Sequence, residues 1–300
     1  MKSIQRVIVS GGAGFTGSIL IECLLAEGIE VYAIVRPNSE HNKRLISDTP
    51  LLHLIELNPE QYSEIPQKIN TSCDIFYHLM WSPEIGKDAQ FKNINYSLDA
   101  LKASAGCGCT RFICTGSQAE YGIVPPDELT TEDHILSPIT PYGKAKTKAC
   151  RITREYAKEL HIEWIWGRIF SLIGKYESTG RMLPGLFLNL YSNKESHLTS
   201  CRQNWDYLDV YDAANALIYL GKMGQAGEIY NIANGNYRPL KEYTESLRRF
   251  VSPETNIIYG EDPNPFISLQ PSVTKLKEDT GWQPNRTFFD SINDYRHYLI

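Results

Sequence analysis

The stretch Val7-Ile8-Val9-Ser10-Gly11-Gly12-Ala13-Gly14-Phe15-Thr16-Gly17-Ser18-Ile19-Leu20 decides the fold of this chain. Its β-branched start predicts a buried strand, and the apolar run after Gly17 predicts a helix. The glycines between them allow a tight turn and let a pyrophosphate approach free N–H groups at the helix N-terminus. The stretch therefore predicts a dinucleotide site, the alternative being a glycine-rich turn that binds nothing. The predicted cofactor contacts in this loop are Gly11, Gly14, Phe15, Thr16 and Gly17.

Strand and helix signals alternate through the first half of the chain, which predicts a Rossmann-type α/β fold with a doubly wound parallel sheet. After Ser171 the pattern is less regular, and its helices predict a smaller, mostly helical substrate lobe. We therefore expect a dinucleotide-binding domain over 1–170 and a substrate-binding lobe over 171–300, with part of 200–235 returning to the first domain. The expected strands are 6–9, 30–35, 51–57, 74–79, 111–115, 163–169 and 228–232. The expected helices include 88–105, 142–160, 180–190, 212–223, 240–250 and 273–280.

Further along the chain, Tyr142 and Lys146 have the spacing that places two side chains on one face of a helix. A lysine ammonium beside a phenol favours the phenolate, so we expect the pKa of Tyr142 to lie below the usual tyrosine value near 10. Ser117 follows the strand that begins near Phe112, and should face the crevice at the carboxyl ends of the parallel strands. The three residues together predict general acid/base chemistry on a carbonyl or a secondary alcohol. Each one taken alone is more often an ordinary surface or turn residue.

The composition argues against several classes of function. A chain of 300 residues with 42% hydrophobic content can build one large unit or a large and a small lobe. A net charge of −5 and the lack of a Lys/Arg-rich block argue against nucleic-acid binding. The odd number of scattered cysteines predicts no disulfide framework, and Cys107-Gly108-Cys109 has no second pair to complete a metal site. Because a strand begins near Ile4 and the apolar runs are short, we expect a soluble, cytoplasmic protein without a signal peptide or membrane span.

The chain resembles, nearly end to end, an extended short-chain dehydrogenase/reductase of the NAD-dependent epimerase/dehydratase family. This resemblance implies that Ser117, Tyr142 and Lys146 form the catalytic triad, that Tyr142 and Lys146 also contact the cofactor, and that the substrate is a nucleotide sugar. It also implies a homodimer, for which Leu98, Leu101, Ile152 and Tyr156 are candidate interface residues, the alternative being that they belong to the core. The matching segments are the glycine loop, 73–79, Asn95, 117–122, 141–146, 167–170, 206–208, 227–232 and 281–284.

The cofactor preference is predicted from the end of the second strand. NAD sites place an acid there to hold the ribose 2′-OH, but this strand ends Ile34-Val35-Arg36. Arg36 could bind a 2′-phosphate through two hydrogen bonds, and Lys43 and Arg44 could add charge. We therefore expect NADP(H) rather than NAD(H), the alternative being that Arg36 stacks on adenine and selects neither. Leu79 and Met80, at the end of the fourth strand, are expected to line the cofactor.

The residues after Ser117 bear on the reaction. By resemblance, the 4,6-dehydratases of the family carry an acidic pair there, whereas this chain has Gln118 and Ala119, neither of which is an acid or base. What remains is a carbonyl/alcohol redox step, either one-way ketoreduction or 4-epimerisation. Arg36 and the short chain favour reduction of the 4-keto group of a nucleotide-linked 4-keto-6-deoxyhexose, and the segment 116–122 resembles that of reductases in deoxysugar and polysaccharide biosynthesis. The alternatives are a 4-epimerase with tightly bound NAD, a reductase of a non-sugar ketone, and a non-catalytic NADP-binding regulator.

The predicted substrate contacts follow from one departure from the family. Many relatives carry Arg-Asp before the aromatic residue of the segment that closes on the nucleotide, and this chain has Trp205-Asp206-Tyr207. Another cation must then meet the diphosphate. The predicted substrate contacts are Gln118, Arg181 and Arg202, with Lys275 as a further candidate cation.

Overall fold

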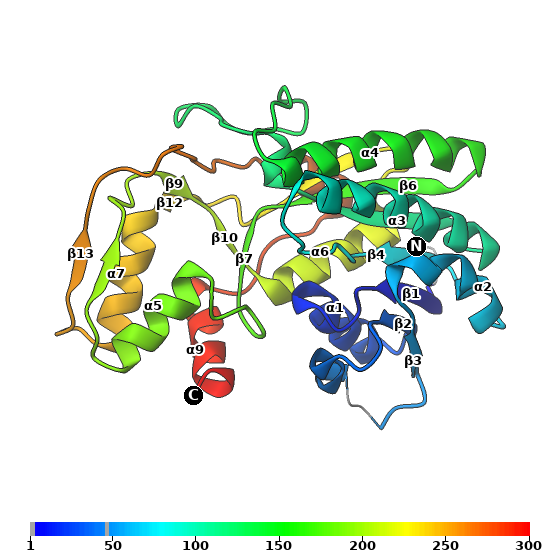
Figure 1. The fold of residues 1–300 in the computed structure, drawn as a ribbon, viewed down its shortest axis with the longest axis horizontal. Helices are drawn as coiled ribbons and strands as arrows, with labels where there is room; N and C mark the ends of the chain where they lie inside the picture. Colours follow the sequence, from blue (N-terminus) through cyan, green and yellow to red (C-terminus); the bar gives the residue numbers. More distant parts are fainter. Residues whose placement is uncertain (1–3, 46–47) are drawn as a thin grey trace.

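The computed structural model describes residues 4–45 and 48–300, and within them a seven-stranded parallel sheet forms the centre of the molecule (Figure 1). The strand order is β11-β6-β5-β4-β1-β2-β3, so the chain winds outward in both directions from β1 and β4. This arrangement confirms the predicted doubly wound, Rossmann-type sheet, whose ligand crevice lies where the winding reverses. The strands are β1 (Arg6–Ser10), β2 (Glu30–Val35), β3 (Leu52–Glu56), β4 (Ile75–His78), β5 (Arg111–Ser117), β6 (Glu163–Ile169) and β11 (Ile229–Ile232).

Two layers of helices cover the sheet. Side chains alternate along each strand, so in β1 Val7 and Val9 pack into one core and Ile8 into the other. The first core includes α1 (Phe15–Ala26) and α6 (Val210–Met223), which pack against each other. The second includes α2 (Ile65–Lys68), α3 (Lys87–Gly106) and α4 (Pro141–Glu159). Short helices η1 (Glu40–Leu45), η2 (Pro59–Glu64) and η3 (Gln118–Glu120) follow β2, β3 and β5 along the chain.

A smaller lobe with its own apolar core extends to one side of the sheet (Figure 1). It contains α5 (Met182–Tyr191), α7 (Leu240–Val251) and α9 (Phe288–Tyr298), around buried Phe187, Leu247 and Tyr295. Short strand pairs frame it: β7 (Ser171–Ile173) with β10 (Tyr207–Asp209), β8 (Ser196–Leu198) with β13 (Ile257–Tyr259), and β9 (Asn204–Trp205) with β12 (Arg238–Pro239). Helix α8 (Thr274–Thr280) packs against α6 and β11.

Two details differ from the sequence predictions. Strand β5 continues through Ser117, because Gly116 and Ser117 pair in register with Arg168 and Ile169 of β6. Among the candidate interface residues, Leu101 is fully buried in the core beneath α3, whereas Tyr156 is 38% exposed. Leu101 is therefore a core residue and not an interface residue. The homodimer stays a prediction. In the described part of the chain, no helix combines the length and hydropathy that a membrane span requires.

Candidate active site

The glycine loop lies at the switch point between β1 and β4. Gly11 has a φ of +72°, and a Cβ on it would lie 2.8 Å from the Met80 nitrogen. A Cβ on Gly17 would lie 2.2 Å from the Gly11 oxygen, so the loop can pack this closely only with glycines at both positions. Leu79 N donates to Ser10 O at 3.1 Å, which joins the ends of the two strands. The structure thus brings Gly11, Gly14, Leu79 and Met80 together at one pocket, and their contact with a cofactor stays a prediction.

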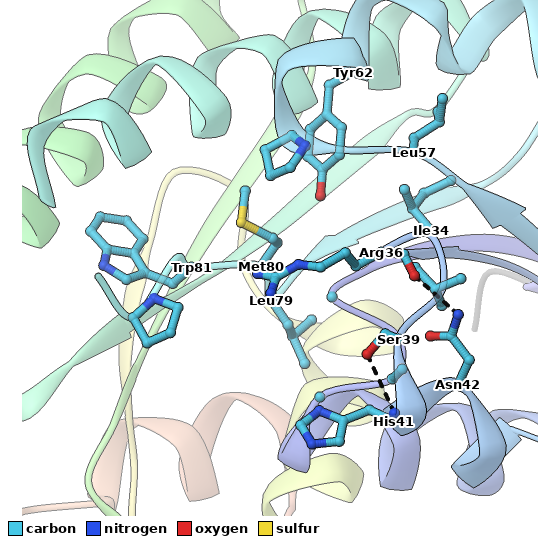
Figure 2. Close-up of a pocket in the computed structure, with 16 residues that line it drawn as sticks. Ile34, Arg36, Ser39, His41, Asn42, Leu57, Tyr62, Leu79, Met80 and Trp81 are labelled. Atoms are coloured by element: carbon cyan, nitrogen blue, oxygen red, sulfur yellow. Dashed lines mark hydrogen bonds between the residues drawn. The ribbon is translucent and has the colours of Figure 1, made fainter. Parts of the chain in front are cut away.

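A pocket of about 300 Å³ opens beside this loop (Figure 2). Arg36, Ser39 and His41 line it together with the loop and with Leu79 and Met80. Among the described residues that line it there is no Asp or Glu, and Arg36 forms no ion pair with any described carboxylate. Figure 2 shows the Arg36 side chain extending into the pocket. The close-packed cradle at Gly11 and this acid-free lining fit a dinucleotide cofactor.

Ser39 and His41 are pocket residues that the sequence analysis missed. The signal was present, because a small hydroxyl residue and a histidine follow Arg36 closely in the same connection. Burial, together with the nearby charges of Arg44 and Arg36, lowers the pKa of His41 below its usual value. This end of the pocket is therefore electropositive even when His41 is neutral.

The other two basic residues of this connection have separate surroundings. Arg44 Nη1 donates to Ala13 O at 3.2 Å, and its guanidinium lies 4.7 Å from the ring centroid of Tyr176. Lys43 does not line the pocket; its side chain is exposed and pairs with Glu40 at 2.5 Å. The expectation that Lys43 adds charge to the cofactor site is therefore wrong, since a surface carboxylate already holds its ammonium.

Ser117 is held at the end of β5 by a buried carboxylate. Glu120 is fully buried; its Oε1 accepts from Ser117 N at 2.8 Å and from Trp166 Nε1 at 3.0 Å. Its Oε2 pairs with Arg168 Nε at 3.0 Å. A Cβ on Gly116 would lie 2.4 Å from Glu120 Oε1, so a side chain at this position would displace the carboxylate from its hydrogen bonds. Ser117 Oγ also accepts from Ala119 N at 3.2 Å and caps η3. The serine is thus positioned by a rigid turn.

Tyr142 and Lys146 reach Ser117 because α4 begins against that turn. Thr140 caps the helix, its Oγ1 accepting from Gly143 N at 3.0 Å, and a Cβ on Gly143 would lie 2.2 Å from Ala119 O. Lys146 is 3% exposed, and its Nζ donates to Thr115 O at 2.6 Å. The structure therefore brings all three predicted catalytic residues together at the carboxyl end of β5.

The expectation of a lowered tyrosine pKa is wrong. Burial raises the pKa of Tyr142 above 10 even though a hydrogen bond with Ser117 and the charge of Arg181 act in the opposite direction. Burial also lowers the pKa of Lys146 to about 8. The Lys146 ammonium lies 5.9 Å from the centre of the Tyr142 ring, too far to outweigh desolvation of the phenolate. Tyr142 is consequently protonated at neutral pH and is ready to donate a proton.

Two family positions have structural roles. Burial lowers the pKa of His78 to about 3, and its ring forms hydrogen bonds with Ser10 at 2.7 Å and Ser97 at 3.2 Å. Asn95, the residue matched by resemblance, is exposed. Asn93 is fully buried, and its side-chain amide accepts a hydrogen bond from Ser82 N and donates one to Ser82 O. The two side chains face opposite ways because two residues along a helix is roughly half a turn, so the buried polar position here belongs to Asn93.

The candidate substrate residues differ in their distance from the predicted catalytic residues. Arg181 lines a pocket of about 520 Å³ with Trp81, Thr140 and Tyr142, and also a second pocket beside the glycine loop. Gln118 is the first residue of η3, directly after Ser117. Arg202 instead is exposed and paired with Asp262, and Lys275 is paired with Glu228 at 2.6 Å. Of the three cations, Arg181 is the one placed beside Tyr142.

Comparison with known proteins identifies the family. Residues 7–233 match the family model described as NAD dependent epimerase/dehydratase family. The chain belongs to the NAD-dependent epimerase/dehydratase family. It is 25% identical over 329 residues to UDP-arabinose 4-epimerase 1 of Arabidopsis thaliana, covering 95% of this chain and 76% of that protein. It is also 25% identical over 308 residues to GDP-6-deoxy-D-mannose reductase of Pseudomonas aeruginosa, covering 96% and 95%.

Solved structures agree on the fold of this epimerase/dehydratase-family protein. UDP-glucuronic acid 4-epimerase from Bacillus cereus, in complex with NAD, superposes with a TM-score of 0.85 at 19% identity, covering 99% of this chain and all of that one. RMD from Pseudomonas aeruginosa, complexed with NADPH, gives 0.80 at 21% identity, covering 97% and 98%. Within residues 4–45 and 48–300, no group of three or more His, Cys, Asp or Glu is arranged to hold a metal ion.

Proposed function

We propose that this protein uses NADPH to reduce the 4-keto group of a nucleotide-linked 4-keto-6-deoxyhexose. The observation that carries the proposal is the cofactor pocket, where Arg36 extends into an acid-free lining that also contains Ser39 and His41. A guanidinium and a hydroxyl suit a ribose 2′-phosphate, and an acid that would favour the unphosphorylated ribose is missing from the described lining. A phosphorylated, exchangeable cofactor fits a reductase, which must release the oxidised form after each turnover.

The catalytic residues have complementary roles in this reaction. When bound, NADPH supplies a hydride for the C4 carbonyl carbon. Tyr142, protonated at neutral pH, donates its phenolic proton to the developing C4 alkoxide. The Ser117 hydroxyl, fixed by the turn around Glu120, hydrogen-bonds the same oxygen. The Lys146 ammonium stabilises the phenolate that remains on Tyr142.

Dehydration is disfavoured as a reaction of this site, because Gln118 and Ala119 offer no acid or base at the start of η3.

The substrate class and setting follow from similarity. The relative named GDP-6-deoxy-D-mannose reductase matches this chain over nearly the whole length of both, which supports a deoxysugar nucleotide as substrate. Residues 1–170 would then bind the cofactor and 171–300 the sugar nucleotide, with Gln118 and Arg181 in contact with it. We further propose that the enzyme acts as a homodimer, as the family resemblance implies, and that it acts in the cytoplasm, as expected from its short apolar runs and scattered cysteines.

A 4-epimerase that retains NAD is the second candidate. The similarity to UDP-arabinose 4-epimerase 1, at the same 25% identity as the reductase and over 95% of this chain, favours it. The two candidates differ in cofactor balance, since an epimerase regenerates its nicotinamide within each cycle.

A stoichiometry measurement distinguishes the two. The protein is given NADPH and a panel of nucleoside-diphosphate-linked 4-keto-6-deoxyhexoses carrying each common base, and NADPH oxidation and products are followed by absorbance and mass spectrometry. We expect one panel member to give one NADP⁺ and one 4-hydroxy product per substrate consumed. Interconversion of two 4-hydroxy sugar nucleotides without net cofactor consumption would instead identify an epimerase. Loss of water from a 6-hydroxy sugar nucleotide would overturn the argument from Gln118 and Ala119.

A further inference from the structure

Trp81, three residues beyond the end of β4, stands between the two functional pockets. It lines the cofactor pocket together with Arg36 and the glycine loop (Figure 2). It also lines the pocket that contains Tyr142 and Arg181. Trp81 directly follows Leu79 and Met80, the two residues of this strand end that the sequence predicts to line the cofactor. A large aromatic ring at this boundary must contact groups on both sides.

The indole contacts both members of the catalytic pair. Lys146 Nζ lies 3.8 Å from the Trp81 ring centroid, while the same ammonium donates to Thr115 O at 2.6 Å. The Tyr142 ring meets the indole edge-on, with centroids 5.9 Å apart and an interplanar angle of 89°. Both geometries are the favourable ones, a cation over an aromatic face and a T-shaped aromatic pair.

The indole is itself held in place from α3. Trp81 Nε1 donates to Gln90 Oε1 at 2.8 Å, and Gln90 is 6% exposed. Gln90 Nε2 in turn donates to the Glu84 carbonyl, so the amide ties the indole to the loop that follows it. This bridge fixes the ring plane relative to Lys146.

The surroundings of Lys146 make the aromatic face important. Lys146 forms no ion pair with any carboxylate in the part of the chain that the structure describes. The nearest titratable groups on the strands are uncharged at neutral pH, since burial raises the pKa of Cys114 to about 12 and lowers that of His78 to about 3. Glu120 attracts the ammonium but is already paired with Arg168. Among the described residues, the Thr115 carbonyl accepts a hydrogen bond from the ammonium and the Trp81 ring lies against it.

We propose that Trp81 is a positioning residue that holds Lys146 and Tyr142 in their catalytic arrangement and keeps the Lys146 ammonium charged, with its indole face against the ammonium and its ring against the phenol. The role rests on the catalytic pair of the proposed function, but its main test requires no substrate. Burial already lowers the pKa of Lys146 to about 8, so the loss of a stabilising contact would bring deprotonation into the neutral range.

The test is a titration of Lys146 by NMR in protein labelled with ¹³C at lysine Cε. The Lys146→Arg variant assigns the signal, and the titration midpoint is compared in the parent, Trp81→Phe and Trp81→Leu proteins. We expect the midpoint to fall by about one pH unit in Trp81→Leu, since a desolvated cation–π contact corresponds to about a tenfold change in proton affinity. Trp81→Phe retains an aromatic face and should stay within about half a unit of the parent.

Gln90→Leu serves as a second variant that leaves the indole in place. It removes the hydrogen bond to Trp81 Nε1 and should shift the midpoint downward by less than Trp81→Leu does. It also decides the question if Trp81→Leu fails to fold. The proposal is overturned if the Lys146 midpoint is unchanged or higher in folded Trp81→Leu protein. If Trp81→Leu does not fold, the same result in Gln90→Leu overturns it.

Activity gives an independent readout. On whichever panel sugar is turned over, the alkaline limb of kcat/KM should move to lower pH in Trp81→Leu and recover in Trp81→Phe. If no panel sugar is turned over, the proposed function fails while the titration still tests Trp81. A shifted titration midpoint without turnover of any panel sugar would therefore count against the proposed function alone. Turnover with an unshifted midpoint would count against the role of Trp81 alone.

Discussion

Replacing Arg36 with alanine tests the cofactor assignment most directly. Arg36 is the charged side chain that extends into the pocket from the end of β2, and it forms no ion pair with any described carboxylate. Its guanidinium is therefore free to pair with a 2′-phosphate. We expect the parent protein to bind NADPH more tightly than NADH, and Arg36→Ala to remove most of that difference while leaving NADH affinity nearly unchanged.

The magnitude follows from the position of Arg36. A hydrogen bond to a charged group contributes roughly 1.5–3 kcal/mol when it is well shielded. Arg36 is exposed to solvent and partly screened, so we expect a value at or below the lower end of that range, about 1–2 kcal/mol in the difference between the two binding free energies. At about 1.4 kcal/mol per tenfold, this corresponds to a roughly 5- to 30-fold loss of preference for NADPH.

Titration calorimetry with each nucleotide gives the four dissociation constants needed. Lys43→Ala is the matched control, because Lys43 is a cation of the same connection that pairs with Glu40 and does not line the pocket. Its preference for NADPH should equal that of the parent. Equal affinities for the two nucleotides in the parent, or an equal weakening of both in Arg36→Ala, would refute the reasoning.

Two further substitutions test the site around Ser117. Tyr142→Phe should keep the melting temperature and the NADPH affinity but lower turnover roughly 100-fold or more, because a positioned proton donor typically accelerates a reaction by a factor of about 10²–10⁴. Turnover near the parent rate would show that Tyr142 is not the acid. Glu120→Ala should lower the free energy of unfolding by about 3–5 kcal/mol in urea titrations, since it leaves the buried Arg168 unpaired and two N–H donors unsatisfied. The control Glu40→Ala, at an exposed pair, should change it by less than about 0.5 kcal/mol, and equal effects of the two would contradict the network.

The sequence predicted the parts of this molecule that depend on local patterns. Alternating apolar runs placed the strands within a residue or two, and strand 163–169 was predicted with both of its ends correct. Glycines that permit close packing identified the loop at Gly11 and Gly17, since a side chain there would collide with backbone. Helical spacing brought Tyr142 and Lys146 to one face. Each of these signals lies within one element or at one junction.

What the sequence could not predict depends on contacts between distant segments. The pKa of Tyr142 was expected to fall because Lys146 is close in sequence, whereas burial, set by the whole surrounding fold, raises it. Arg202 and Lys275 looked available because their partners, Asp262 and Glu228, are far away along the chain. Helix α9 was missed because its apolar side chains pack in the core of the smaller lobe, beside β10 and among residues of α5 and α7 that are distant in the sequence.

The predicted catalytic residues and the residues predicted to select the cofactor and tune the site lie in different parts of the fold. Ser117, Tyr142 and Lys146 lie on the sheet and on a long helix, held by Glu120 and by close glycine contacts, so their geometry is set by the fold. Arg36 and Trp81 lie just beyond strand ends, on the connections after β2 and β4. Residues there can vary without disturbing the core, because loops on a rigid scaffold tolerate change. The fold thus sets the geometry of the predicted catalytic groups, and on our proposals the two connections set which cofactor these groups meet and the pH range in which they act.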